Sequence, residues 1–156
     1  MAFQVTCRGT IFPIQYSQNQ GIAICDHNGL TEGLKIMKLP GPDHPITITA
    51  NPKRIRVTSD GVVIAETTHA LTLKEASYPA VQYVPRADAK MELLKRSDRV
   101  THCPYKGDAS YFSVVANGKA IENAIWTYET PFPAMTEISG HLAFYPDKVK
   151  IEEVAG

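Results

Sequence analysis

The dipeptide Asn117-Gly118 restricts the fold of this chain more than any other feature of the sequence. Asn-Gly favours the two-residue turn of a β-hairpin, because both residues tolerate the positive φ that this turn requires. The strand before it, over 111–116, carries apolar residues at both alternating sets of positions, which predicts a central strand of a sheet. The return strand is predicted over 119–127 and carries Trp126.

Shorter strands and turns fill the rest of the chain from residue 46 onward. Asp60-Gly61 predicts a second hairpin, between strands over 54–58 and 62–67. Asp88 is a good N-cap for a short helix predicted over 88–94, and a helical turn is predicted over 135–138. Further short strands are predicted near 46–48, 70–73, 81–83, 142–144 and 149–151. The predicted fold class is therefore mainly β, a single compact β-rich domain with one or two short helices.

Residues 1–36 differ in character from the rest and are predicted to form a loosely packed N-terminal extension. Within this extension a strand is predicted over 22–24 and a short amphipathic helix over 31–37. The β-rich domain is expected over 37–156, and Met37 is a candidate alternative start.

Composition excludes several classes of function. The 16 basic and 16 acidic residues cancel, so no nucleic-acid partner is expected. No apolar run is long enough to span a membrane, and no secretory signal is visible, so a cytoplasmic protein is expected. The three cysteines are odd in number and irregularly spaced, which fits a reducing compartment. Closely spaced ligand pairs and glycine-rich phosphate loops are absent from the sequence, so neither a metal nor a cofactor is predicted.

The segment RVTHCPYKG, before the central strand, contains Cys103, the candidate catalytic residue. A thiol becomes nucleophilic as the thiolate, which the nearby Lys106 would favour. A residue before proline is biased toward extended backbone, so His102 and Cys103 should point to opposite sides. A base would then have to come from elsewhere, for example His69 or His141. The alternative is that Cys103 is a small buried hydrophobe.

Arg86 and Lys106 are candidates for a small anion site. Arg86 follows a strand that ends at Pro85, and a guanidinium binds carboxylate or phosphate through two hydrogen bonds. The alternative for Arg86 is an ion pair with Asp88 or Glu129, and the alternative for Lys106 is a solvated position in a turn.

Aromatic residues are candidates for the walls of a pocket that takes a flat ligand or a sugar. Trp126 and Tyr128 are two residues apart, so they share one face of a strand. Tyr83 and Tyr111 lie in other predicted strands and complete the candidate ligand-binding set. The alternative is that all four rings belong to the core.

Five motifs give this chain a family resemblance. In order they are PGPDHP (40–45), YVPRAD (83–88), THCPYKGD (101–108), WTYE (126–129) and GHLAFY (140–145). Over about 37–153 the chain resembles the family catalogued as domain of unknown function 427, also labelled nucleotidyltransferase-like. The resemblance implies a compact β-rich unit similar to the β-tent architecture. The chain lacks the CxxC pairs of zinc-bearing relatives and the carboxylates and phosphate loop that nucleotidyltransferases need.

Two functions are consistent with these patterns. In the first, Arg86, Lys106, Cys103 and the aromatic residues form a pocket for a small anionic metabolite, with or without catalysis. In the second, the same motifs only build the fold of a non-catalytic homodimeric module, since exposed strand edges favour self-association.

Overall fold

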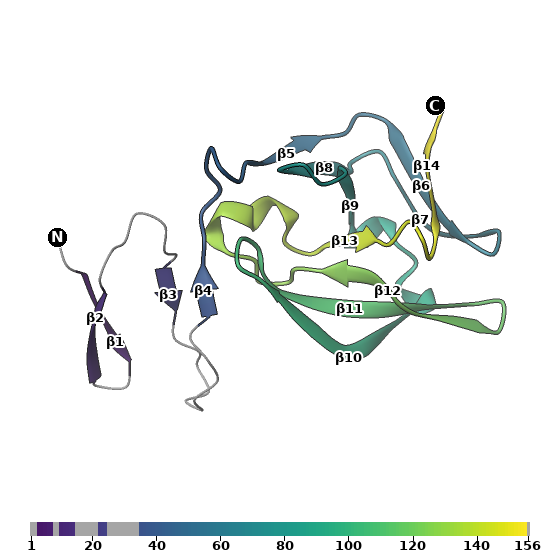
Figure 1. Cartoon of the computed structure of the whole chain (residues 1–156). Coiled ribbons are helices and arrows are strands. Elements are labelled where there is room, and N and C mark those ends of the chain that lie inside the picture. The colour runs from purple at the N-terminus through teal and green to yellow at the C-terminus, as the bar shows by residue number, and fades with distance from the viewer. Residues whose placement is uncertain (1–2, 8–9, 15–21, 25–34, 156) are drawn as a thin grey trace. The chain divides into compact units, whose positions relative to one another are not determined.

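The computed structural model describes residues 3–7, 10–14, 22–24 and 35–155 (Figure 1). The chain divides into two compact units, Met1–Leu39 and Pro40–Gly156. In the first unit, β1 (Phe3–Cys7) pairs antiparallel with β2 (Thr10–Ile14), and β3 (Ile22–Ile24) pairs antiparallel with β4 (Lys35–Met37).

Two predictions for the first unit can be compared with the structure. The strand predicted over 22–24 is confirmed as β3. The helix predicted over 31–37 is wrong in its described part, because 35–37 form the strand β4. Its residues 31–34 lie outside the described residues.

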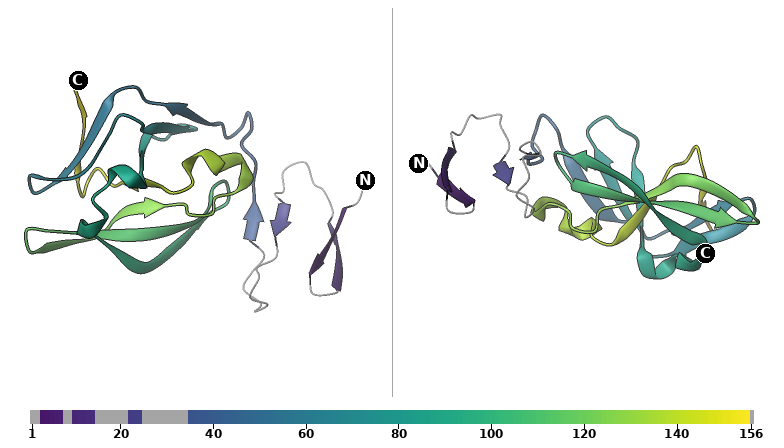
Figure 2. Two further views of the ribbon diagram at one scale, coloured as in Figure 1. Left: turned by 180° about the vertical axis from the view of Figure 1, so that it is seen from behind. Right: turned by 90° about the horizontal axis from the view of Figure 1, so that it is seen from below.

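The second unit contains two antiparallel sheets and is mainly β, as predicted (Figure 2). The larger sheet has the strand order β10-β11-β12-β13-β9-β8-β5, and the smaller has the order β14-β6-β7. The strands of the larger sheet are β5 (Ile46–Ala50), β8 (Leu71–Glu75), β9 (Val81–Pro85), β10 (Leu94–Cys103), β11 (Gly107–Ala116), β12 (Lys119–Thr127) and β13 (His141–Phe144). Those of the smaller sheet are β6 (Arg54–Ser59), β7 (Val62–Thr67) and β14 (Lys150–Val154).

Both predicted hairpins are present. Asp60 and Gly61 have φ values of 48° and 78°, and Asn117 and Gly118 have values of 51° and 72°. Two consecutive positive φ values are what a two-residue hairpin turn of the primed type requires. The turns join β6 to β7 and β11 to β12, and β11 lies inside the sheet between β10 and β12.

The helical segments are short 3₁₀ turns, named η1 (Arg86–Asp88), η2 (Met91–Leu93) and η3 (Pro133–Ile138). Of the helix predicted over 88–94, only the 3₁₀ turn η2 and the end of η1 are present, and the rest of the prediction is wrong. Asp88 caps nothing and instead accepts a hydrogen bond of 2.6 Å from the Thr67 hydroxyl. Leu94 already belongs to β10, where it pairs with Val114. Sheet pairing outweighs the helical preference of so short a segment, which cannot stabilise itself.

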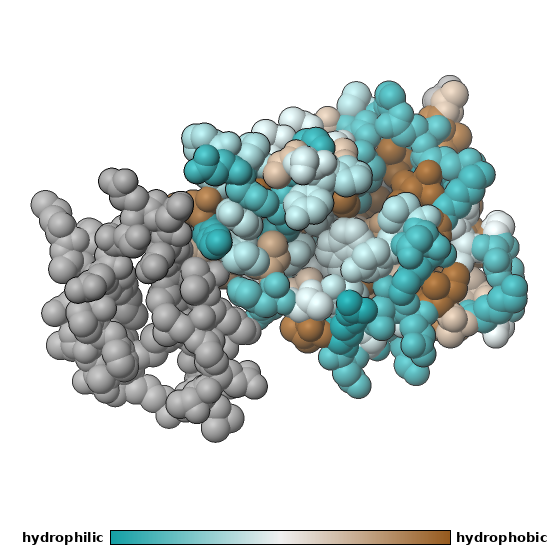
Figure 3. All heavy atoms as spheres, in the orientation of Figure 1, coloured by the Kyte–Doolittle hydropathy of each residue, from teal (hydrophilic) through white to brown (hydrophobic). Residues whose placement is uncertain are grey.

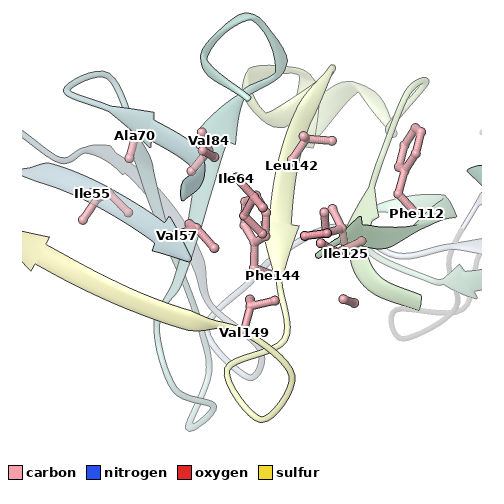
Figure 4. Packing of buried hydrophobic residues seen from close by; sticks show 14 residues of the cluster. Ile55, Val57, Ile64, Ala70, Val84, Phe112, Ile125, Leu142, Phe144 and Val149 are labelled. Carbon is pink, nitrogen blue, oxygen red and sulfur yellow. The ribbon is translucent and has the colours of Figure 1, made fainter. Parts of the chain in front are cut away.

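Each face of the larger sheet packs against a different hydrophobic cluster. Val84, Ile125 and Phe144 face Val57 and Ile64 of the smaller sheet (Figure 4). The neighbouring residues of β9 and β13, Tyr83 and Ala143, belong to the second cluster on the opposite face. The segment η3 contributes to this second cluster through Met135 and Ile138. Side chains alternate along a strand, so each of these strands serves both clusters.

The surface of the second unit is mostly hydrophilic, with smaller hydrophobic areas scattered over the face shown in Figure 3. Such scatter is normal for globular proteins. Among the described residues, no helix is both long enough and apolar enough to cross a membrane.

Candidate functional site

A cavity of about 210 Å³ opens on the face of the larger sheet that packs against the second cluster. It combines hydrophobic side chains, aromatic rings and one pair of opposite charges. The lining residues are Leu73, Glu75, Val81, Tyr83, Lys106, Tyr111, Trp126, Tyr128 and Tyr145.

Side chains at paired positions of four neighbouring strands form one wall of this cavity. Tyr83 of β9 pairs with Ala143 of β13, Ala143 pairs with Trp126 of β12, and Trp126 pairs with Tyr111 of β11. The alanine leaves a low point between the flanking rings, since side chains directly opposite one another share one face of a sheet. Tyr83 and Trp126 stand edge-to-face at 6.4 Å, and the Trp126 Nε1 donates a hydrogen bond of 3.3 Å to the Tyr83 hydroxyl.

Further tyrosines surround this wall. The Tyr145 ring lies 4.6 Å from that of Trp126, and the Tyr111 hydroxyl lies 2.8 Å from the Thr101 hydroxyl. Burial and a hydrogen bond with Tyr111 raise the pKa of Tyr145 to about 12. Burial raises the pKa of Tyr83 and of Tyr128 as well. These phenols therefore stay protonated at neutral pH, and their side chains line the cavity.

Lys106 is buried at the cavity, so the alternative of a solvated turn lysine is wrong. Its ammonium contacts one carboxylate oxygen of Glu75, and the side chains are only 8% and 17% exposed. The other oxygen of Glu75 lies 2.9 Å from His44 Nε2, and the His44 ring stacks on Tyr105 at 4.1 Å. Burial raises the pKa of Glu75, but the hydrogen bonds from Lys106 and His44 outweigh it, and the net shift is downward.

A tight connection between β10 and β11 holds Lys106 in this position. The Lys106 amide donates to the carbonyl of Cys103 at 3.3 Å, and the Lys106 carbonyl accepts from the Phe132 amide at 2.9 Å. The next residue, Gly107, has a φ of 105°. This backbone conformation is available almost only to glycine, so the Lys-Gly order in the sequence places the lysine side chain.

Cys103 is half-buried beside the second cluster and does not belong to the cavity lining. Its Sγ lies 3.8 Å from the Lys106 Nζ. His102 instead contacts Asp108, with 2.6 Å between Nδ1 and Oδ1. Among the described residues, no hydrogen bond joins Cys103 to His69 or His141. The hydrogen-bond partner of the Cys103 thiol among the described side chains is therefore the Lys106 ammonium.

Arg86 lies apart from Lys106. Its Nη2 donates to the Glu129 carboxylate at 3.1 Å, and its guanidinium lies 5.5 Å from the ring centroid of Phe112. Phe112 belongs to the first cluster, on the face opposite the cavity. The ion pair of Arg86 with Glu129, one of the two alternatives that the sequence left open, is present, and among the described residues no hydrogen bond joins Arg86 to Lys106.

The structure thus brings Tyr83, Lys106, Tyr111, Trp126 and Tyr128 together around one cavity. The sequence analysis missed three polar or aromatic residues of this site, which are Glu75, His44 and Tyr145. His44 and Tyr145 occur in two of the motifs quoted above, which was the available signal. Glu75 stands at a strand end with no local pattern that marks it.

Within the part of the chain that the structure describes, no three His, Cys, Asp or Glu side chains are grouped as metal ligands would be. The model of a protein family described as domain of unknown function (DUF427) matches residues 47–155, which is more than half of the chain. No curated protein matches the chain.

Proposed function

This chain belongs to the family described as domain of unknown function (DUF427), and we propose that it binds a small molecule in the cavity around Trp126 and Lys106. The observation that carries the proposal is the row of aromatic rings beside a buried lysine–glutamate pair. Ligand sites combine mostly apolar and aromatic walls with a few polar groups that orient the ligand. This cavity has both parts.

The lining limits the kind of ligand. About 210 Å³ is below the ~300 Å³ at which drug-sized sites begin, so the ligand is a small compound of one ring or similar size. Its flat face would lie against Trp126, and its hydrogen-bond acceptors would face the phenol groups and Lys106. Among the described residues, no hydrogen bond engages the hydroxyl of Tyr128, which leaves it available to a ligand.

Cys103 is the candidate reactive group of this proposal. A ligand held by Lys106 would lie near the thiol, because Lys106 Nζ and Cys103 Sγ are 3.8 Å apart. Alkylation with iodoacetamide, followed by peptide mass spectrometry, tests this role. We expect saturating ligand to slow the modification of Cys103, and an unchanged rate would remove Cys103 from the site.

The chain contains one tryptophan, so its fluorescence reports on this cavity alone. We expect a saturable change in Trp126 emission on titration with small ring compounds, for which benzoate, phenyl phosphate and benzyl alcohol are the probes. Lys106→Met should weaken binding, and Tyr128→Phe, which removes only a hydroxyl group, should weaken it less. Lys119→Met is the matched control, because Lys119 is an exposed lysine paired with Asp60. The proposal fails if none of the probes gives a saturable change with the wild-type protein.

The homodimeric module remains the alternative, and one observation favours it. Val100 is 63% exposed on β10, which is an edge strand of the larger sheet. An exposed edge can pair with a second copy. Light scattering after size exclusion tests this alternative, and a concentration-independent monomer mass contradicts it.

A further inference from the structure

We propose that Arg99, at the rim of the cavity, binds the anionic group of the ligand. This inference rests on the proposed function. It gives to Arg99 the anion-binding role that the sequence predicted for Arg86, and it names the class of ligand. It follows from the backbone of β10, from the contacts of the Arg99 side chain and from the pairing of the neighbouring charges.

A bulge in β10 positions Arg99. Arg96 pairs with Phe112 and Val100 pairs with Ser110, so three residues of β10 lie opposite the single residue Tyr111. The Ser97 hydroxyl fixes this bulge, since it donates to the Asn123 side chain at 2.6 Å and accepts from the Arg99 amide at 3.4 Å. Figure 1 shows β10 bent along its length. Bulges of this kind redirect a side chain and are frequent beside functional sites.

The redirected guanidinium lies against the cavity. Its Cζ is 4.7 Å from the ring centroid of Tyr111, whose ring lines the cavity. The same charge acts on Tyr145, a second lining residue. Burial raises the pKa of Tyr145, and the charge of Arg99 partly opposes that rise. Arg99 therefore stands beside two rings of the lining while remaining exposed to solvent.

Arg99 is also the one arginine of the described residues that makes no ion pair. Among the described residues, no carboxylate lies within ion-pair distance of it, whereas the other described arginines each contact one. Those pairs are Arg54 and Arg56 with Glu66, and Arg86 and Arg96 with Glu129. Lys106, inside the cavity, is neutralised by Glu75.

Within the part of the chain that the structure describes, Lys148 is a further cation near the lining. Lys148 Nζ is 5.6 Å from the Tyr145 ring centroid, but it donates to the carbonyls of Glu122 and Asn123 at 2.7 and 3.3 Å. Its hydrogen-bonding capacity is therefore largely used. An anion that enters the cavity meets Arg99 as the available partner.

The chemistry of the guanidinium fits this role. Stacking on Tyr111 leaves the donor edge of Arg99 free, and that edge matches the two oxygens of a carboxylate or phosphate. The resulting ligand class is a small ring compound with one anionic group, its ring against Trp126 and its anion at the rim.

Trp126 emission tests this proposal with two probes of similar size, benzoate and its uncharged counterpart benzyl alcohol. We expect Arg99→Gln to weaken benzoate binding about tenfold, as expected for losing a charge-assisted hydrogen bond, and to leave benzyl alcohol binding unchanged. Arg99→Lys should retain part of the benzoate affinity, because it keeps the charge without the planar fork. Arg54→Gln, in the smaller sheet, is the matched control and should bind both probes as the wild type does.

The outcomes separate this inference from the function on which it rests. If wild-type protein binds benzoate and Arg99→Gln binds it equally well, Arg99 is not the anion partner, while the cavity remains a binding site. If Arg99→Gln weakens both probes equally, Arg99 acts by packing on Tyr111, and the inference is overturned. If neither probe binds the wild type, the proposed function fails and this inference fails with it.

Discussion

The ammonium of Lys106 contacts the carboxylate of Glu75 within the cavity, and both side chains are largely withdrawn from water. The two residues come from distant parts of the chain, the β10–β11 connection and the end of β8. His44 completes the carboxylate's partners at 2.9 Å. The Glu75 carboxylate thus joins three separate segments of the second unit at the cavity.

Removing the lysine should destabilise the protein strongly. Lys106→Met leaves the Glu75 carboxylate buried without its cation, and we expect the free energy of unfolding in urea to fall by about 3 kcal/mol. Lys119→Met is the control, because Lys119 and Asp60 are 72% and 46% exposed and the loss should stay below about 1 kcal/mol. The double variant Lys106→Met/Glu75→Gln should recover part of the loss, since the unpaired charge is gone. Equal losses for the two lysines would contradict this account of the pair.

The same pair predicts a pH dependence of stability. The folded-state pKa of Glu75 lies below its ordinary value of 4.5, so its stabilising contribution is present above that pH. The contribution is lost as pH falls through the lowered folded-state pKa. We expect the stability difference between wild type and Glu75→Gln to be largest near neutral pH and to shrink on acidification, measured by urea unfolding at each pH. A difference that stays constant from neutral to strongly acidic pH would argue against it, and Glu122→Gln is an exposed control.

Gly107 should not tolerate a side chain. Its φ of 105° is outside the range that other residues readily adopt, so we expect Gly107→Ala to cost about 1–3 kcal/mol. A Cβ at this position would also lie 3.5 Å from the Phe132 amide nitrogen. At Gly41 nothing lies within 4 Å of the place that a Cβ would take and φ is not positive, so Gly41→Ala should be nearly neutral. Thermal unfolding of the two variants compares them directly.

Enlarging Ala143, the alanine in the cavity wall, should disturb the rings on either side of it. Ala143 is fully buried between Tyr83 and Trp126, so Ala143→Leu should overpack the row and destabilise the protein by about 1–3 kcal/mol. The emission of Trp126 should shift as its surroundings change. Ala120→Leu, on an exposed position of β12, should alter neither property. Unchanged stability and emission in Ala143→Leu would contradict the tight packing of Ala143 between Tyr83 and Trp126.

Local turn chemistry explains what the sequence could predict about the fold. Asp60-Gly61 and Asn117-Gly118 specify hairpins by themselves, because the positive φ values are a property of those residues. The helix prediction at Asp88 rested on the same kind of local preference. Its preference for a helix N-terminus is real, but the pairing of Leu94 with Val114 depends on a strand distant in the sequence.

The candidate site likewise shows that local patterns do not reveal contacts between residues distant in the sequence. Trp126 and Tyr128 could be placed on one face by simple alternation, and both line the cavity. Glu75 could not be found, since β8 is separated from β11 by three strands in the sheet order and only the tertiary fold brings Glu75 to Lys106. The position of Arg86 at the end of a strand predicts a side chain that projects into a cleft, whereas its guanidinium lies beside Phe112, a residue of the first cluster.

The two faces of the larger sheet also set which changes in chain length the protein can accept. In β9 and β13, neighbouring residues such as Tyr83 and Val84 serve the cavity and the packed interior in turn. Inserting or deleting one residue there would exchange the two sets, sending rings into the interior and aliphatic side chains into the cavity. Single substitutions can therefore reshape the cavity, while additions and deletions are confined to the turns between strands.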